Sequence, residues 1–142
     1  MAPGFWMQRS GRRVYKMADA MVTLIARKKL VRARAGAIEL PPIVAMAFGT
    51  GGVDADGIPI EPSDSDEGLK NEVFRKAIDN YTFIDDTTCR YFCTLAVDEC
   101  VGETINELGL CDAEGDIIAL KTFRDKGKDG DLEMTFRIDD IF

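Results

Sequence analysis

The segment 104–120 constrains the fold of this chain more than any other part of the sequence. It consists of an apolar run, a short polar turn and a second apolar run, TINELGLCDAEGDIIAL. Asp112, Glu114 and Gly115 mark the turn, because Asp tolerates turn geometry and Gly adopts positive φ at no steric cost. Two apolar runs around such a turn predict an antiparallel β-hairpin.

Further segments have the pattern of β-strands. The strictest alternation occurs in 132–138, where apolar and polar residues take turns, as in a strand with one buried and one wet face. Shorter candidates are 43–48, 81–84 and 89–97. Glycines follow the first of these at 49–52, and we interpret them as a turn because the lysine of a phosphate-binding P-loop is missing. The acidic segment 53–68, rich in Pro, Gly and Ser, predicts a surface loop.

Two segments in the first half have helical periodicity. In 14–34, apolar residues recur at three- and four-residue steps, and Gly36 provides a natural stop. In 66–78, Asp66 would cap a helix on which Glu72 and Arg75 form a surface pair. Helices that precede the strands argue against a parallel βαβ sheet. The sequence therefore predicts an α+β fold with an N-terminal helix, a short second helix and a mainly antiparallel β-sheet.

Several predicted strands are apolar on both faces. In 89–97, Tyr91, Cys93 and Leu95 would lie on one face, and Phe92 and Ala96 on the other. A single sheet with two apolar faces needs two covers. The helices would provide one, and either a second subunit or a two-layer core within one chain would provide the other. Because exposed apolar surface favours association, the first alternative predicts a homotrimer when combined with the resemblance described below.

The charge is unevenly distributed along the 142 residues, which suit a single domain. Residues 1–35 hold nine Lys and Arg against one acidic residue, so the rest must carry −15 to give the net charge of −7. We interpret 1–16 as a basic arm and 17–142 as the domain. The arm shows neither a clear aromatic platform nor a clear recognition helix, which argues against nucleic acid as the partner. No apolar run is long enough to predict a membrane span.

Few residues point to chemistry. Histidine is absent, so general acid–base catalysis would fall to other side chains, and the carboxylates cluster at turns. We expect no enzyme, no catalytic residue and no cofactor. The four cysteines lack the spacing of a zinc ribbon and predict buried free thiols, with a four-cysteine metal site or disulfides as alternatives. Asp54 and Asp129 lie in DADG and DGD sequences, which leave a calcium-stabilised or other metal-stabilised binding module as the alternative function.

The hairpin segment is similar in wording to the N-terminal domain of phage tail-collar fibre proteins, which carry E-x-G-L-x-D-x-x-G-x-x-x-A. The corresponding residues here are Glu107, Gly109, Leu110, Asp112, Gly115 and Ala119. Leu69, Glu72 and Arg75 match a second family segment, L-x-x-E-x-x-R. The opening from Met17, the glycine turn at 49–52 and the closing strand 132–138 are also similar, so the resemblance covers about 17–142.

This resemblance implies a structural part of a contractile phage tail or tail-like particle, located in the virion tail and present in the host cytoplasm during assembly. In that family the domain ties a trimeric fibre to the baseplate, so a baseplate protein and a tail fibre protein are the expected partners, with no membrane. Because most relatives continue into a shaft beyond the point where this chain ends, we expect an adaptor for a separate fibre, or a truncated or split fibre protein. The expected core or subunit-interface residues are Leu24, Ile25, Leu110, Ile118, Phe123, Phe136 and Ile138.

Overall fold

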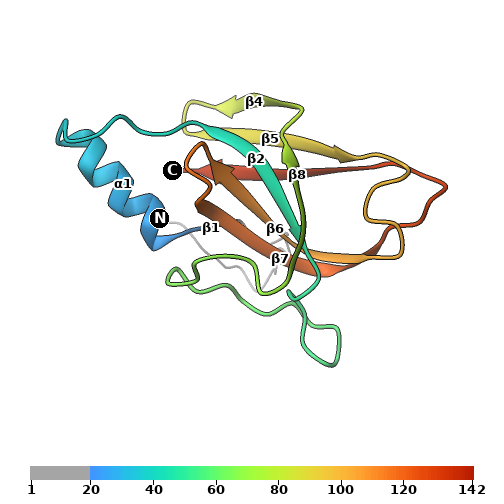
Figure 1. Cartoon of the computed structure of the whole chain (residues 1–142). Helices are drawn as coiled ribbons and strands as arrows, with labels where there is room; N and C mark the ends of the chain where they lie inside the picture. The colour runs from blue at the N-terminus through green and yellow to red at the C-terminus, as the bar shows by residue number, and fades with distance from the viewer. Residues whose placement is uncertain (1–19) are drawn as a thin grey trace, which may run out of the picture.

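Two antiparallel β-sheets form the framework of the computed structural model, which describes residues 20–142 (Figure 1). The five-stranded sheet has the order β1-β7-β6-β2-β3, and the three-stranded sheet has the order β4-β5-β8. The elements are β1 (Met21–Val22), α1 (Leu24–Arg34), β2 (Ile43–Gly49), β3 (Glu72–Ala77), β4 (Asn80–Asp85), β5 (Thr88–Leu95), β6 (Thr104–Asp112), β7 (Ile117–Gly127) and β8 (Met134–Ile141).

The α+β prediction is wrong, because the described part of the chain is nearly all β and its only helix is the short α1. The expected second helix at 66–78 is mostly strand β3, which pairs with β2. Phe74 lies opposite Phe48 in this pairing and the two rings pack with centroids 6.4 Å apart, so sheet pairing outweighs the helical pattern. Asp66 accepts a hydrogen bond from the Ser63 backbone N–H instead of capping a helix.

A β-bulge explains why Glu72 and Arg75 nevertheless form the expected ion pair. Gly49 lies opposite Glu72 and Phe48 opposite Phe74, so Val73 is an extra residue in β3. The extra residue brings Glu72 and Arg75 to the same side of the strand, where an unbulged strand would separate them. Two hydrogen bonds of 2.9 and 2.8 Å join the two side chains.

The first helix is shorter than the periodicity predicts. Its first described portion is strand β1, which pairs with β7, and α1 begins only after Thr23. The Thr23 hydroxyl accepts the N–H of Ala26 as an N-cap and lies 2.9 Å from the Ile117 carbonyl oxygen, to which it donates. Gly36, with φ of 82°, follows the end of the helix as expected. Residues 14–19 of the predicted helix, like the arm 1–16, lie outside the described residues.

The strand predictions are otherwise confirmed. The 104–120 hairpin is β6 and β7 around the turn at Asp112–Asp116, and Gly115 has φ of 89°. The segments 43–48, 81–84, 89–97 and 132–138 correspond to β2, β4, β5 and β8, with ends shifted by a few residues. Residues 53–68 form the loop between β2 and β3, apart from an isolated bridge between Val53 and Pro59.

The main core lies between the two sheets, within one chain. Phe136 of β8 packs across the interface against two aromatic side chains of the five-stranded sheet, with its ring 5.4 Å from that of Phe48 in β2 and 6.2 Å from that of Phe123 in β7. The other buried members of this core are Met46, Cys93, Leu95, Ile105, Leu108, Leu110, Ala119 and Ile138. The two sheets therefore cover each other, as the two-layer alternative requires, and the apolar strands do not by themselves call for a second subunit.

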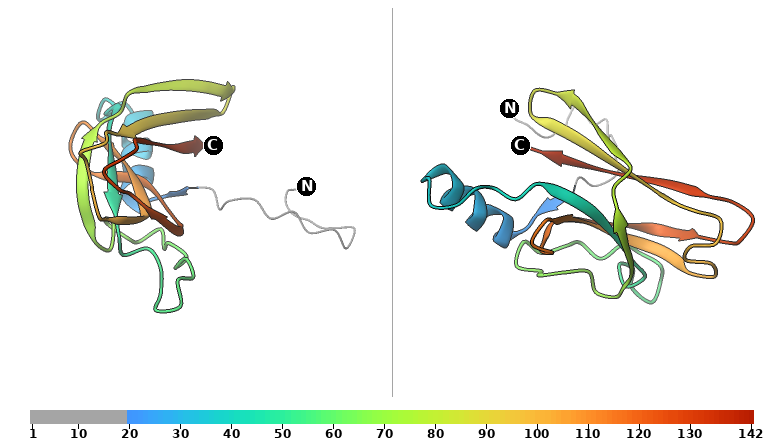
Figure 2. Two further views of the ribbon diagram at one scale, coloured as in Figure 1. Left: turned by 90° about the vertical axis from the view of Figure 1, so that its right-hand side faces the viewer. Right: turned by 45° about the horizontal axis from the view of Figure 1, so that its top comes forward.

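The three-stranded sheet is not fully covered by the five-stranded one. Figure 2 shows the ends of β4, β5 and β8 reaching past the larger sheet. Tyr81 lies opposite Tyr91 and Phe83 opposite Cys89, so both β4 aromatics are on the inner face of their sheet. They are nevertheless 58% and 72% exposed. The overhang thus leaves apolar inner surface open to solvent.

Candidate functional site

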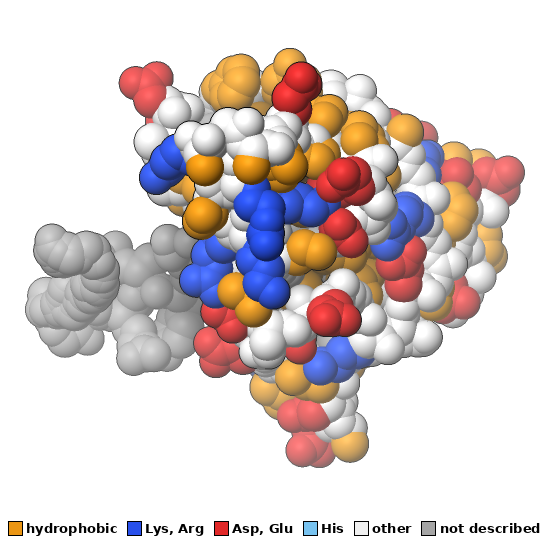
Figure 3. Space-filling model, turned by 60° about the vertical axis from the view of Figure 1, so that its left-hand side comes forward, with side chains coloured by type: hydrophobic (Ala, Val, Ile, Leu, Met, Phe, Trp, Pro, Cys, Tyr) orange, Lys and Arg blue, Asp and Glu red, His pale blue; other side chains and the backbone are white. Residues whose placement is uncertain are grey.

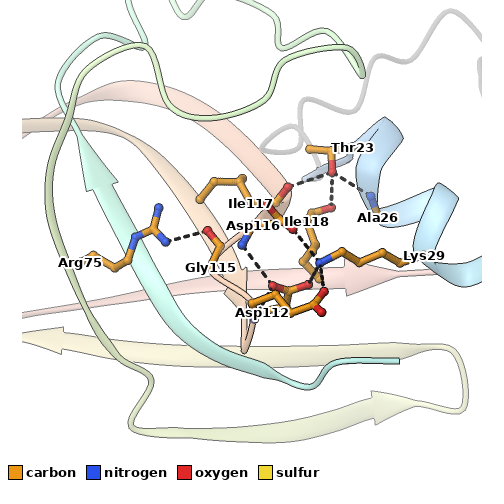
Figure 4. Close-up of polar contacts among 10 residues, drawn as sticks. Thr23, Ala26, Lys29, Arg75, Asp112, Gly115, Asp116, Ile117 and Ile118 are labelled. Atoms are coloured by element: carbon orange, nitrogen blue, oxygen red, sulfur yellow. Dashed lines mark hydrogen bonds and ion pairs between the residues drawn. The ribbon is translucent and has the colours of Figure 1, made fainter. Parts of the chain in front are cut away.

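The turn between β6 and β7 holds the ammonium group of Lys29 among three carboxylates (Figure 4). The Lys29 Nζ lies 2.5 Å from Asp112 Oδ2, 2.7 Å from Glu114 Oε1 and 2.7 Å from Asp116 Oδ2. The side chains of Lys29 and Asp112 are only 11% and 1% exposed. We call Lys29, Asp112, Glu114 and Asp116 the lysine cage.

Hydrogen bonds within the turn orient Asp112 for its contact with Lys29. Asp112 Oδ1 accepts the backbone N–H groups of Glu114 and Asp116, which closes the turn and leaves Oδ2 for Lys29. Burial alone would lower the pKa of Lys29, but the hydrogen bonds to Asp112, Asp116 and Glu114 outweigh it and raise the pKa above its ordinary value. The lysine is therefore held as a cation, and it fastens α1 to the hairpin.

The cage also bears on the calcium alternative. Among residues 20–142, one group of three carboxylates is close enough to share a metal ion, and it is Asp112, Glu114 and Asp116. Its centre is taken by the Lys29 ammonium. Asp54 and Asp129, the residues that suggested calcium, accept backbone N–H groups within their own turns, from Asp56 and Ile58 and from Asp131 respectively.

Glu107 ties the glycine-rich loop to the sheet. Its buried carboxylate accepts three backbone N–H groups, from Gly51 at 2.8 Å and from Lys70 and Asn71 at 2.9 Å each. Neighbouring Asn106 accepts the N–H of Gly52 at 2.7 Å. The N–H groups of Gly51 and Gly52 are thus already bound to side chains and are not free to bind a phosphate, which agrees with the interpretation of 49–52 as a turn.

The other residues of the family-like pattern also make contacts that hold the strands and the hairpin turn together. Arg75 donates to the Gly115 carbonyl oxygen at 2.9 Å, so the bulged β3 holds the hairpin turn. A Cβ on Gly109 would lie 3.0 Å from Ile117 Cδ1 and 3.4 Å from Leu69 Cδ2, so a larger residue here would require the Ile117 side chain to shift. Ala119 is fully buried opposite Leu110.

The seven residues expected in the core or at a subunit interface fall into two groups. Leu110, Phe123, Phe136 and Ile138 are buried between the sheets. Ile118 is partly buried against that core, Ile25 is partly buried on α1, and Leu24 is 40% exposed. On α1 the buried residues are instead Ala26 and Lys29. The helical face that packs on the protein is therefore rotated from the predicted one.

All four cysteines carry free thiols. Cys93 and Cys111 are buried, and Cys89 and Cys100 are partly buried. Burial raises the pKa of the Cys111 thiol to about 11 and that of Cys93 to about 12. Thiols that stay protonated at neutral pH are poor nucleophiles, so the two buried cysteines act as small apolar side chains.

Two kinds of surface remain available to partners. The outer side of α1 carries the exposed basic residues Arg27, Lys28, Arg32 and Arg34, and Figure 3 shows Lys and Arg side chains gathered on this face. Val31, on the same helix, is 70% exposed. The second surface is the overhanging inner face of β4, with Tyr81 and Phe83. The single helix among residues 20–142, α1, lacks the length and apolar character needed to cross a membrane.

Comparison with known proteins identifies the family. A family model described as phage tail-collar fibre protein, N-terminal, matches residues 17–135. The chain belongs to this family. The match spans nearly the whole chain and supports a structural role in a phage tail, with the virion tail as the location. No curated protein matches the chain.

The family assignment gives the motif residues a structural meaning. Glu107, Asp112, Gly115 and Arg75 do not converge on a cavity but join separate segments to the hairpin. Sequence reasoning missed Lys29, since it sits in a basic run with no visible difference from its neighbours. It also missed Asn106 and Asp140, which are buried polar residues in strands. Ala26 and Lys29 are three residues apart and so share one side of the helix, a spacing that could have indicated that Lys29 packs against the protein.

Proposed function

We propose that this chain is a non-catalytic assembly adaptor that joins a tail fibre to the baseplate of a contractile phage tail or tail-like particle. The observation that carries the proposal is the family match over residues 17–135. The family-like residues support it because their hydrogen bonds and ion pairs hold separate segments of the fold together. A joint that transmits force needs such a fixed shape. A baseplate protein and a tail fibre protein are the proposed partners, and host cytoplasm is the proposed site of assembly.

The two open surfaces suggest how the adaptor would engage them. The basic outer side of α1 suits an acidic surface on the baseplate, since opposite charges guide association and fix orientation. The exposed aromatic side chains of β4 suit contact with a segment of the tail fibre protein, and a homotrimer is the proposed oligomeric state. Leu24 and Ile25 on α1 and Ile118 on β7 are the predicted interface residues that remain at least partly accessible.

The adaptor role is tested by assembling particles without this protein. The gene for this chain is interrupted, and the particles that are then produced are viewed by negative-stain electron microscopy. They should have complete tails and baseplates that lack fibres. Expression of the intact chain in trans should restore the fibres, and so should a matched control variant with Asp54→Asn in the surface loop. Fibres still attached in its absence would exclude the adaptor role. Loss of the whole baseplate would assign the chain to the baseplate itself.

A further inference from the structure

A cleft lies between α1, the segment that follows it and the far ends of β5 and β8. Its volume is about 280 Å³. Most of the lining is apolar and comes from four parts of the fold: Val22 of β1, Ala26 and Leu30 of α1, the segment from Leu40 to Ile43, and Ile118 of β7. Tyr91, Asp140 and Phe142 line it from the side of the three-stranded sheet.

Asp140 is the unusual member of this lining. Its exposed fraction is 8%, and it has no hydrogen-bond or ion-pair partner among residues 20–142. Its backbone lies opposite Cys89 in the sheet, and Cys89 lies opposite Phe83, so the carboxyl is on the inner face of the overhang. A buried carboxylate without a partner is costly, and folded proteins pair most such groups.

Two cations of the surrounding elements, Lys29 and Arg90, do not pair with Asp140. Lys29 also lines the cleft, but its ammonium is bound by the three carboxylates of the lysine cage. Arg90, the next basic residue along β5, pairs with Asp139 on the opposite face of the sheet at 2.7 Å. Burial of Asp140 without compensation raises the pKa of its carboxyl. Residues 20–142 therefore provide the cleft and the carboxyl group but no cation that pairs with it.

We propose that this cleft receives a segment of a partner polypeptide in which an Arg or Lys is flanked by apolar side chains. The cation would pair with Asp140, and its apolar neighbours would cover the cleft walls and the adjoining aromatic surface of Tyr81, Phe83 and Phe142, which are 58%, 72% and 67% exposed. This inference rests on the proposed adaptor function and names the chemistry of one of its contacts.

Charge and shape both favour this occupant over an uncharged peptide. Pairing would replace an isolated buried carboxylate with a charge-assisted hydrogen bond, among the stronger non-covalent contacts in proteins. The exposed aromatic side chains extend the apolar surface beyond the cleft. A peptide with apolar residues on both sides of its cation would therefore bury more apolar area than the cation alone. Retaining an unpaired buried charge at a stability cost is typical of functional positions.

The test uses the full-length protein and two matched peptides. Acetyl-Leu-Arg-Leu-amide and acetyl-Leu-citrulline-Leu-amide differ only in the charge of the central side chain. Each is titrated to millimolar concentration into ¹⁵N-labelled protein. The arginine peptide should shift the amide resonances of α1, the end of β8 and Tyr91, and the citrulline peptide should bind at least tenfold more weakly.

Two variants separate the cleft from general surface charge. Asp140→Asn should lose at least tenfold in affinity for the arginine peptide while remaining folded, because it removes only the charge of the carboxyl. Asp139→Asn changes the next residue, whose side chain is on the other face, and should bind as the wild type does. Equal binding of both peptides, equal binding by Asp140→Asn, or no shift at millimolar peptide would overturn the proposal.

Other occupants give different results. If the cleft resonances shift with protein concentration and not with peptide, a second copy of this chain occupies the cleft and the proposal is wrong. The particle experiment above is independent of these outcomes. An adaptor that fails the peptide test would still be required for fibre attachment, whereas failure of the adaptor role would be seen as fibres that remain attached.

Discussion

Replacement of Lys29 by Met should destabilise the protein by about 3 kcal/mol. Methionine keeps most of the apolar stem and removes the ammonium, so the buried Asp112 carboxylate loses its cation. Removal of one partner of a buried ion pair costs about 3–5 kcal/mol. The two backbone N–H groups that remain on Asp112 place the cost near the lower end of this range. Glu114 and Asp116, 61% and 40% exposed, would add about 0.2–1 kcal/mol each at most.

Urea denaturation followed by circular dichroism measures this cost. Lys28→Met on the exposed side of α1 is the control and should change stability by less than about 0.5 kcal/mol. Combining Lys29→Met with Asp112→Asn should recover about 2 kcal/mol relative to the sum of the single changes, because Asn can still accept the turn N–H groups. A loss below about 1 kcal/mol for Lys29→Met, or simple additivity in the double variant, would refute the cage as a fastening of α1.

The same variant tests the cage geometry with a metal ion. Without the ammonium, the oxygen atoms of Asp112, Glu114 and Asp116 remain within 4.8 Å of one another, a spacing that suits Ca²⁺. Millimolar calcium should therefore raise the melting temperature of Lys29→Met and leave that of the wild type unchanged. A calcium shift in the wild type would instead support the metal-stabilised module, and no shift in either protein would contradict the open-cage geometry.

Four further predictions concern Asp140, Glu107, Phe136 and the oligomeric state. The pKa of Asp140 is raised, so the stability that its neutral form provides is full below the ordinary value of 3.8 and is lost as the pH rises through the raised value. Asp140→Asn should thus melt above the wild type at pH 7, with the difference closing toward pH 4, and equal melting at pH 7 would contradict this. The other titratable residues that line the cleft, Lys29, Asp112 and Tyr91, are the same in the variant and the wild type, so the difference in melting reports on Asp140. Glu107→Gln should cost about 2–3 kcal/mol in urea unfolding, because the amide presents a donor where three N–H groups need acceptors, and a neutral effect would argue against the tie to the glycine loop. Phe136→Asp should yield no soluble folded protein, since it buries an unpaired charge between the sheets, whereas normal melting and mass would contradict the core assignment. Light scattering at micromolar concentration should give three times the chain mass, and a single monomeric species would count against the homotrimer.

Period-two patterns were the most informative part of the sequence. The hairpin at 104–120 and the alternating strand at 132–138 could be predicted because local turn chemistry and alternation agree with the final sheet. The segment 66–78 could not, because its helical spacing competes with pairing to β2, and only the tertiary contact between Phe74 and Phe48 decides the outcome.

The candidate site was predictable only in part. Its turn residues Asp112, Glu114 and Gly115 were visible from composition, and the family-like pattern pointed to Glu107 and Arg75. The partner Lys29 is 83 residues away from Asp112, and nothing local distinguishes it from Lys28. The lack of a partner for Asp140 among residues 20–142 depends on which side chains surround it after folding, so no sequence pattern could reveal it.

The most direct test of the adaptor role is a density map of the intact particle. Our proposal places this fold, recognised by its five-stranded and three-stranded sheets, at the junction of baseplate and fibre in three copies around the fibre axis. The outer side of α1 should face the baseplate. Density for this chain in the tail tube, in the sheath or at the receptor-binding tip of the fibre would contradict the role of a joint.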